Sequence, residues 1–134
     1  MHPSQRAPAG PRGAIGAAAE AAAAAHLRHR GWVVLGRNLR VGRDEVDLLA
    51  REPGCPPVLV VLEVRARSRS GFGSPLESVD DGKVARLYRA AWALRRSGHP
   101  AVAEAELSAI RWRIDLITLR RSASGEWLVE QHLR

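Results

Sequence analysis

Two strand-like segments joined by a tight connection constrain the fold of this chain more than any other feature. Residues 44–50, DEVDLLA, mix charged and apolar side chains, and residues 58–67, VLVVLEVRAR, are mostly branched and apolar. Both patterns predict β-strands. The connection at 52–57, EPGCPP, is rich in turn-forming residues. We therefore expect the two strands to pair antiparallel.

Charged residues inside these strands raise the question of how they are compensated. Alternation places Glu45 and Asp47 on one face of the first strand, and Glu63, Arg65 and Arg67 on one face of the second. We expect the other face of each strand to be its core face. Buried charge is unfavourable unless it is paired or binds a metal. If the strands are neighbours, Asp47 and Glu63 converge, and Mg²⁺ or Mn²⁺ would remove their repulsion.

The rest of the chain predicts two helices and three further strands. Apolar residues at helical spacing indicate helices over 13–29 and 78–98. Strands are expected over 32–41, with a break near Gly36, and over 110–121 and 127–133. The order is α-β-β-β-α-β-β. This order predicts an α/β fold with a mixed β-sheet flanked by helices.

Finer expectations concern the ends of the first helix and the packing of the second. Residues 1–12 contain three prolines and predict a disordered tail, which leaves residues 13–134 as a single domain. Gly31 is expected at the C′ position that ends the first helix. The apolar stripe of the second helix is expected to consist of Val84, Leu87, Tyr88, Ala91 and Leu94.

Composition indicates the kind of binding partner and the cellular compartment. The 134 residues carry a formal charge of +7, which favours a polyanionic partner such as nucleic acid. Twenty of the 21 basic residues are arginine, a bias that GC-rich coding also produces, and the single lysine is Lys83. The sequence has no membrane-spanning apolar run, no secretory signal and only one cysteine, Cys55. We expect a cytoplasmic protein without a membrane partner.

Seven short motifs, in this order, are similar to a known pattern. The chain resembles the YraN-like family of uncharacterised bacterial proteins, which is described as Holliday-junction-resolvase-like or restriction-endonuclease-like. DEVDLLA followed by VLVVLEVRAR also resembles the paired motif of the PD-(D/E)XK nucleases, in which E-x-K ends the second strand. The resemblance implies a restriction-endonuclease-like core. The motifs are GAAAEAAAAAHL (16–27), GRNLR (36–40), RDEVDLLA (43–50), VLVVLEVRAR (58–67), GFGSP (71–75), Lys83 and RIDLITL (113–119).

The resemblance also implies roles for individual residues. Asp47 and Glu63 would be the metal-binding pair, joined by the backbone carbonyl of Val64 and by Glu20 from the first helix. Arg65 stands where the motif has lysine. Arginine can stabilise developing charge and bind a phosphate, but it stays protonated and cannot act as a general base. With Asp47 and Glu63, Arg65 completes the expected catalytic set.

Other residues are expected to contact the substrate. Lys83 would supply the missing lysine if the start of its helix lies over the site. Arg67 and Arg69 are expected to contact a polyanion backbone. Phe72 is a candidate ring for stacking on a base, with packing against the sheet as the alternative.

The alternatives are structural. Asp47 and Glu63 would form an ion-pair network with Arg65 and Arg67, and Asp115 is interpreted as a structural salt bridge. Three functions follow: a metal-dependent nuclease acting on DNA, with branched DNA as one candidate substrate; a non-catalytic nucleic-acid-binding module with a nuclease-like fold; and a protein–protein adaptor. A homodimer would suit a two-fold symmetric junction.

Overall fold

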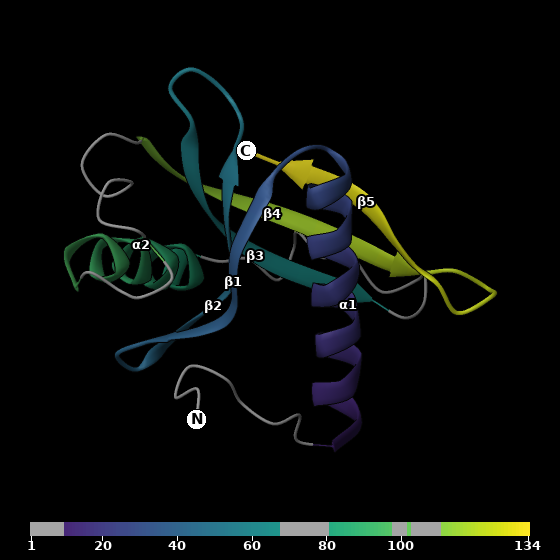
Figure 1. Cartoon of the computed structure of the whole chain (residues 1–134). Helices are drawn as coiled ribbons and strands as arrows, with labels where there is room; N and C mark the ends of the chain where they lie inside the picture. Colours follow the sequence, from purple (N-terminus) through teal and green to yellow (C-terminus); the bar gives the residue numbers. More distant parts are fainter. Residues whose placement is uncertain (1–9, 68–80, 98–101, 103–110) are drawn as a thin grey trace.

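The computed structural model describes residues 10–67, 81–97, 102 and 111–134. These residues form an α/β fold in the predicted order α-β-β-β-α-β-β (Figure 1). The first helix begins at Gly10, three residues before the expected start, and residues 1–9 of the expected tail lie outside the described part of the chain. The elements are α1 (Gly10–His29), β1 (Val33–Val41), β2 (Asp44–Glu52), β3 (Val58–Arg67), α2 (Asp81–Ser97), β4 (Arg111–Arg121) and β5 (Trp127–Leu133).

The five strands form one mixed sheet in the order β1-β2-β3-β4-β5. Neighbours pair antiparallel except β3 and β4, which pair parallel. The antiparallel pairing of β2 with β3 is as predicted. Parallel neighbours require a crossover, and α2 lies on the crossover between β3 and β4.

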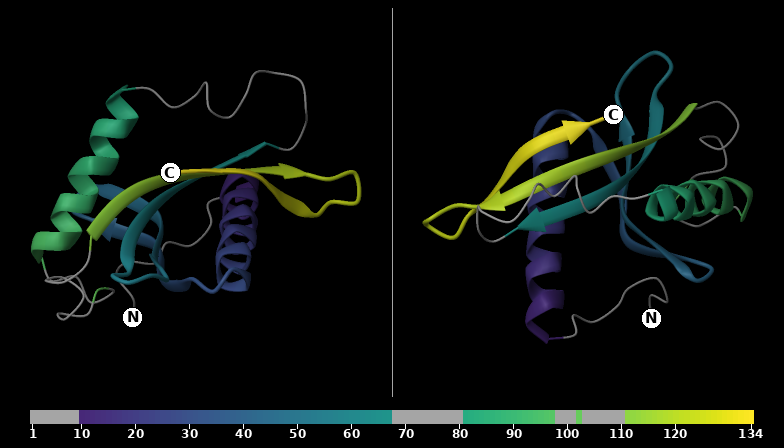
Figure 2. Two further views of the ribbon diagram at one scale, coloured as in Figure 1. Left: turned by 90° about the horizontal axis from the view of Figure 1, so that it is seen from above. Right: turned by 180° about the vertical axis from the view of Figure 1, so that it is seen from behind.

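Helices cover both faces of this sheet. In Figure 1 α1 lies in front of the strands, and from behind the strands lie in front of α1 (Figure 2). Apolar residues of α1, including Leu27, pack with Val60 and Leu62 of β3, whereas residues of α2, including Leu94, pack with Leu59 and Val61. The expectation of one core face per strand is therefore wrong, because α2 covers the face that also carries Glu63.

The predicted stripe of α2 is correct in its centre and wrong at its margin. Leu87, Ala91 and Leu94 are buried, whereas Val84 is 37% exposed and Tyr88 is 57% exposed. A helix that packs on one sheet face buries only a stripe of its surface. Val84 and Tyr88 lie beside that stripe and face solvent.

Local backbone features match the sequence at two points. Gly31 ends α1 with a φ of 86°, and the N–H groups of Gly31 and Trp32 donate to the carbonyls of Arg28 and Leu27, both at 3.0 Å. The pairing of β1 with β2 is irregular between Val34 and Gly36, near the predicted break. Among the described residues, no helix is long and apolar enough to cross a membrane.

Candidate active site

A fork between β2 and β3 positions the two predicted carboxylates. Paired residues run from Glu52 and Val58 to Leu48 and Leu62, and the next residues along the two strands are Asp47 and Glu63. The N–H of Val64 donates to Oδ2 of Asp47 at 2.8 Å. The Asp47 side chain thus accepts from β3 at the point where the regular register between the two strands ends.

Asp47 lies in an environment that opposes its charge. Burial, and then the nearby Glu63 carboxylate, raise the pKa of Asp47 well above its usual range. The hydrogen bond from Val64 acts in the opposite direction but does not outweigh them, and Glu20 adds to the repulsion. The structure therefore brings Asp47 and Glu63 together and places Glu20 near enough to act on the charge of Asp47.

Glu63 is 5% exposed and is contacted by two cations. Its Oε1 lies 3.0 Å from Nζ of Lys83 and 3.3 Å from Nε of Arg65. The first turn of α2 thus lies over the site, which was the condition for Lys83 to supply the lysine that is absent at position 65.

A second ion pair holds α2 in this position. Arg89 donates from Nε and from its NH2 nitrogen to the two carboxylate oxygens of Asp44, at 2.8 and 2.7 Å. The hydrogen bonds from Arg89 hold the pKa of Asp44 below its usual range. Because Asp44 begins β2 and Arg89 lies in the middle of α2, the pair ties the helix to the strand that carries Asp47.

Glu20 reaches the site from α1, on the other side of the sheet. Burial raises the pKa of Glu20 to about 7, against the opposing charge of Arg37 and a hydrogen bond with Asn38. Its Oε2 atom is buried and has no hydrogen-bond partner among the described residues. Asn38 has a φ of 52°, a left-handed conformation that asparagine tolerates better than most residues. Glu20 is therefore partly unsatisfied in this structure.

Two hollows open on the fork, and Asp47 lines both. One has a volume of about 250 Å³ and also contains Glu20, Val64 and Arg65 in its walls. The other has a volume of about 260 Å³ and is lined mainly by charged residues, among them Lys83. Its walls include three arginines that the sequence analysis did not select: Arg40, Arg43 and Arg86. Arg40 and Arg43 lie within two of the quoted motifs, and Arg86 lies one helical turn after Lys83.

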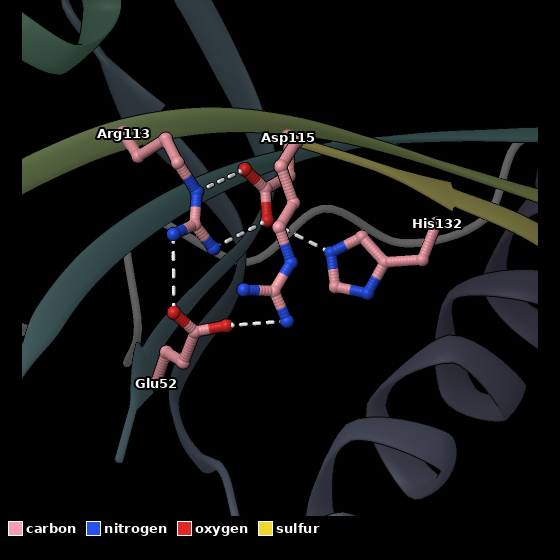
Figure 3. Close-up of polar contacts among 5 residues, drawn as sticks. Glu52, Arg113, Asp115 and His132 are labelled. Carbon is pink, nitrogen blue, oxygen red and sulfur yellow. Dashed lines mark hydrogen bonds and ion pairs between the residues drawn. The ribbon is translucent and has the colours of Figure 1, made fainter. Parts of the chain in front are cut away.

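The remaining predicted residues lie away from the fork or outside the described segments. Arg67 forms an ion pair with Glu130 of β5 at 2.8 Å. Arg69 and Phe72 lie outside the described residues. Asp115 is buried and is bound by Arg113 and His132 (Figure 3), in agreement with its interpretation as a structural salt bridge.

The site offers oxygen ligands but not a complete set of metal-binding side chains. Within the described residues, no three Asp, Glu, His or Cys side chains are grouped closely enough to hold a metal ion. The chemistry of the fork is that of two close carboxylates, a lysine and an arginine.

These features define an α/β protein with a buried, cation-flanked carboxylate pair at a strand fork. Residues 19–119 match the uncharacterised protein family UPF0102, and the chain belongs to this family. A relative from Sorangium cellulosum is 40% identical over 119 residues, which cover 89% of this chain and 78% of that protein. One from Nocardioides is 42% identical over 123 residues, or 90% and 89% of the two chains. One from Deinococcus radiodurans is 50% identical over 76 residues, or 57% and 60%.

Among solved structures, that of Pyrococcus furiosus SfsA in complex with Ca²⁺ is a remote match. The TM-score is 0.36 at 18% identity, with 90% of this chain and 61% of the other covered. A likeness at this level does not establish a common fold or a common site.

Proposed function

We propose that this protein is a metal-dependent nuclease that hydrolyses phosphodiester bonds in nucleic acid, and that Asp47 and Glu63 hold the metal. The observation that carries the proposal is the charge balance at the fork. Two buried carboxylates repel each other there, and burial and Glu63 raise the pKa of Asp47. A bound cation would reverse that effect, because it favours the ionised form of both acids.

The available ligands suit a hard divalent cation. Carboxylate and carbonyl oxygens are typical ligands of Mg²⁺, which often binds only one or two carboxylates and keeps several waters. The N–H and C=O of one extended residue face the same neighbouring strand, so the Val64 carbonyl is directed toward the β2 side, like its N–H. Glu20, with its unpartnered Oε2, is the candidate for a further direct or water-mediated contact. When bound, Mg²⁺ or Mn²⁺ would activate water and polarise the phosphate.

The cations of the site would act on the substrate. Arg65 and Lys83 both contact Oε1 of Glu63, so both are close to the position of the scissile phosphate in this proposal. Each can stabilise negative charge that develops on the phosphate oxygens. Arg65 stays protonated, so Lys83 is the side chain that could also exchange a proton with water.

The substrate class follows from charge. The hollow beside Asp47 is lined by four cations, Arg40, Arg43, Lys83 and Arg86, and by three carboxylates, Asp44, Glu45 and Asp47, and the whole chain carries +7. This excess of positive charge fits a nucleic-acid backbone. DNA, including branched DNA, is the proposed substrate, with a cytoplasmic location and a homodimer that presents two sites.

A cleavage assay tests the proposal. Labelled single-stranded, duplex and four-way-junction DNA would be incubated with the protein in Mg²⁺, Mn²⁺ or EDTA. Asp47→Ala and Glu63→Ala should each lower the cleavage rate on the order of 100-fold or more. Glu130→Ala is the matched control, because it removes an ion-paired carboxylate away from the fork. Metal-independent cleavage, or full activity in both fork variants, would refute the proposal.

A second candidate is a nucleic-acid-binding module without catalysis. It is favoured by Arg65 at the lysine position and by the ion pair that joins Lys83 to Glu63. Salt-dependent DNA binding without metal-dependent cleavage, and unchanged in Asp47→Ala, would support this candidate over the nuclease.

A further inference from the structure

Helix α2 exposes a row of apolar and aromatic side chains away from the candidate active site. Val84, Tyr88 and Trp92 follow each other at four-residue spacing and therefore share one face of the helix. Tyr88 is 57% exposed and Trp92 is 56% exposed. The guanidinium of Arg95 lies over the Trp92 ring, 5.6 Å from its centroid. Exposed aromatic rows of this kind mark binding surfaces more often than isolated apolar residues do.

A groove runs between this row and strand β4. It has a volume of about 450 Å³, and Trp112 and Ile114 form the β4 wall opposite Tyr88 and Trp92. Trp112 is half-buried, whereas Tyr88 and Trp92 are exposed. The groove therefore places two exposed aromatic rings of α2 beside a less exposed ring of β4.

The lining is cationic as well as aromatic. Three arginines and no carboxylate are among the lining residues, namely Arg95, Arg113 and Arg134. Arg113 and Arg134 already form ion pairs with Glu52, whereas Arg95 has no carboxylate partner in the described segments. The groove thus offers aromatic rings and one cation, Arg95, for contact with a ligand.

We propose that this groove binds a single-stranded segment of nucleic acid, with bases stacked on Tyr88 and Trp92. Arg95 contacts a phosphate of the ligand. Aromatic side chains combined with cations are the usual means of binding single strands without sequence preference. This inference rests on the proposed function for its choice of nucleic acid as the partner.

The charge of the groove supports this occupant. Its lining contains three arginines and no carboxylate, which fits the phosphates of a nucleic acid. Trp92 lies nine residues after Lys83, about 14 Å along the axis and on the opposite side of α2, so the groove is a contact separate from the fork. A second copy of this chain is a poorer occupant, because a two-fold contact would bring the arginines of both grooves together.

Fluorescence anisotropy with a labelled oligothymidylate in EDTA tests the groove separately from cleavage. Trp92→Ala should weaken binding about tenfold with an unchanged salt dependence, because stacking is lost and no charge is removed. Arg95→Gln should lower the slope of log affinity against log salt by about 1. Leu128→Ala removes an apolar side chain that is 43% exposed on β5, and it should leave binding unchanged.

The outcomes separate the groove from the nuclease. If Trp92→Ala and the unaltered protein bind equally, or if neither binds, the groove is not a binding site for single strands. This conclusion holds whether or not the protein cleaves DNA. Weaker binding by Trp92→Ala in a protein that never cleaves supports the groove and rejects the nuclease. Sedimentation of the same samples adds a third outcome. Loss of a dimer in Trp92→Ala would assign the row to self-association and would overturn the groove.

Discussion

Two groups of buried or half-buried carboxylates lie on or beside the same sheet, and the protein compensates them in opposite ways. The first, the paired cluster, consists of Glu52 and Asp115. The second, the fork cluster, consists of Glu20, Asp47 and Glu63. Both groups contain strand residues with apolar neighbours along the sequence, so burial alone does not distinguish them.

In the paired cluster every carboxylate oxygen has a cationic or hydrogen-bonding partner (Figure 3). Asp115 accepts from Arg113 at 2.6 and 3.0 Å and lies 2.8 Å from Nε2 of His132. Glu52 contacts Arg113 at 3.0 Å and Arg134 at 2.8 Å. Burial alone would raise the pKa of Asp115, but the hydrogen bonds with His132 and Arg113 outweigh burial and hold it below its usual value. This cluster is complete without a ligand.

In the fork cluster the carboxylates oppose each other instead. The pKa of Asp47 is raised by burial and by Glu63, and burial raises the pKa of Glu20 to about 7. The two cations of the fork both contact Glu63, at the single atom Oε1. The comparison teaches that incomplete compensation, rather than buried charge as such, distinguishes a candidate ligand site from a structural ion pair.

The largest expected change in the free energy of unfolding is in the paired cluster. Asp115→Asn should lower the free energy of unfolding by about 3 kcal/mol, because it leaves the Arg113 charge without its closest partner. Urea unfolding at pH 7 measures the change. Glu130→Gln is the control, since its ion pairs with Arg67 and Arg120 are partly exposed and should contribute no more than about 1 kcal/mol. Equal losses in the two variants would contradict a special role for the buried pair.

The sequence alone was sufficient to predict the element order and the convergence of Asp47 with Glu63. Both follow from local information, namely strand alternation and the short connection between β2 and β3. The structural interpretation of Asp115 also needed only its spacing from Arg113, two residues away on the same face.

Long-range contacts account for what could not be predicted. Lys83 reaches Glu63 because α2 packs on the sheet, where Arg89 also pairs with Asp44, which lies 45 residues earlier in the chain. Arg113 similarly contacts Glu52 across 61 residues. The packing of α2 on the charged face of β3, which buries Leu59 and Val61, likewise depends on where the crossover places the helix. No local pattern encodes these distances.

A substitution in the fork cluster is expected to stabilise the metal-free protein, whereas Asp115→Asn destabilises it. In EDTA, Asp47→Asn should raise the free energy of unfolding at pH 8, because burial and Glu63 raise the pKa of Asp47 and so disfavour its ionised form in the folded state. The asparagine Oδ1 can still accept from Val64. The gain should shrink as the pH falls toward the ordinary aspartate pKa of 3.8, because folded Asp47 then binds a proton while the unfolded aspartate is still largely ionised.

A divalent cation should reverse the order of stability of the unaltered protein and Asp47→Asn. Mg²⁺ is expected to stabilise the unaltered chain and to have little effect on Asp47→Asn, because only the former supplies both carboxylates. Destabilisation by Asp47→Asn in EDTA would place Asp47 with Asp115 as a structural residue, and it would remove the contrast between the clusters.

The smallest expected change in stability tests the contribution of Glu20 to the fork cluster. Its pKa is raised from 4.5 to about 7, so the folded state binds more protons than the unfolded state between these values. Stability should therefore fall as the pH rises through this window. Glu20→Gln should remove that fall and stabilise the metal-free protein by about 1 kcal/mol above pH 7, an effect reduced by the partial exposure of the side chain. Thermal unfolding from pH 4.5 to 8.5 measures the difference, with Glu126→Gln on the β4–β5 turn as the exposed control. A constant difference across this range would mean that Glu20 does not titrate within the fork, and the fork cluster would then be reduced to Asp47 and Glu63.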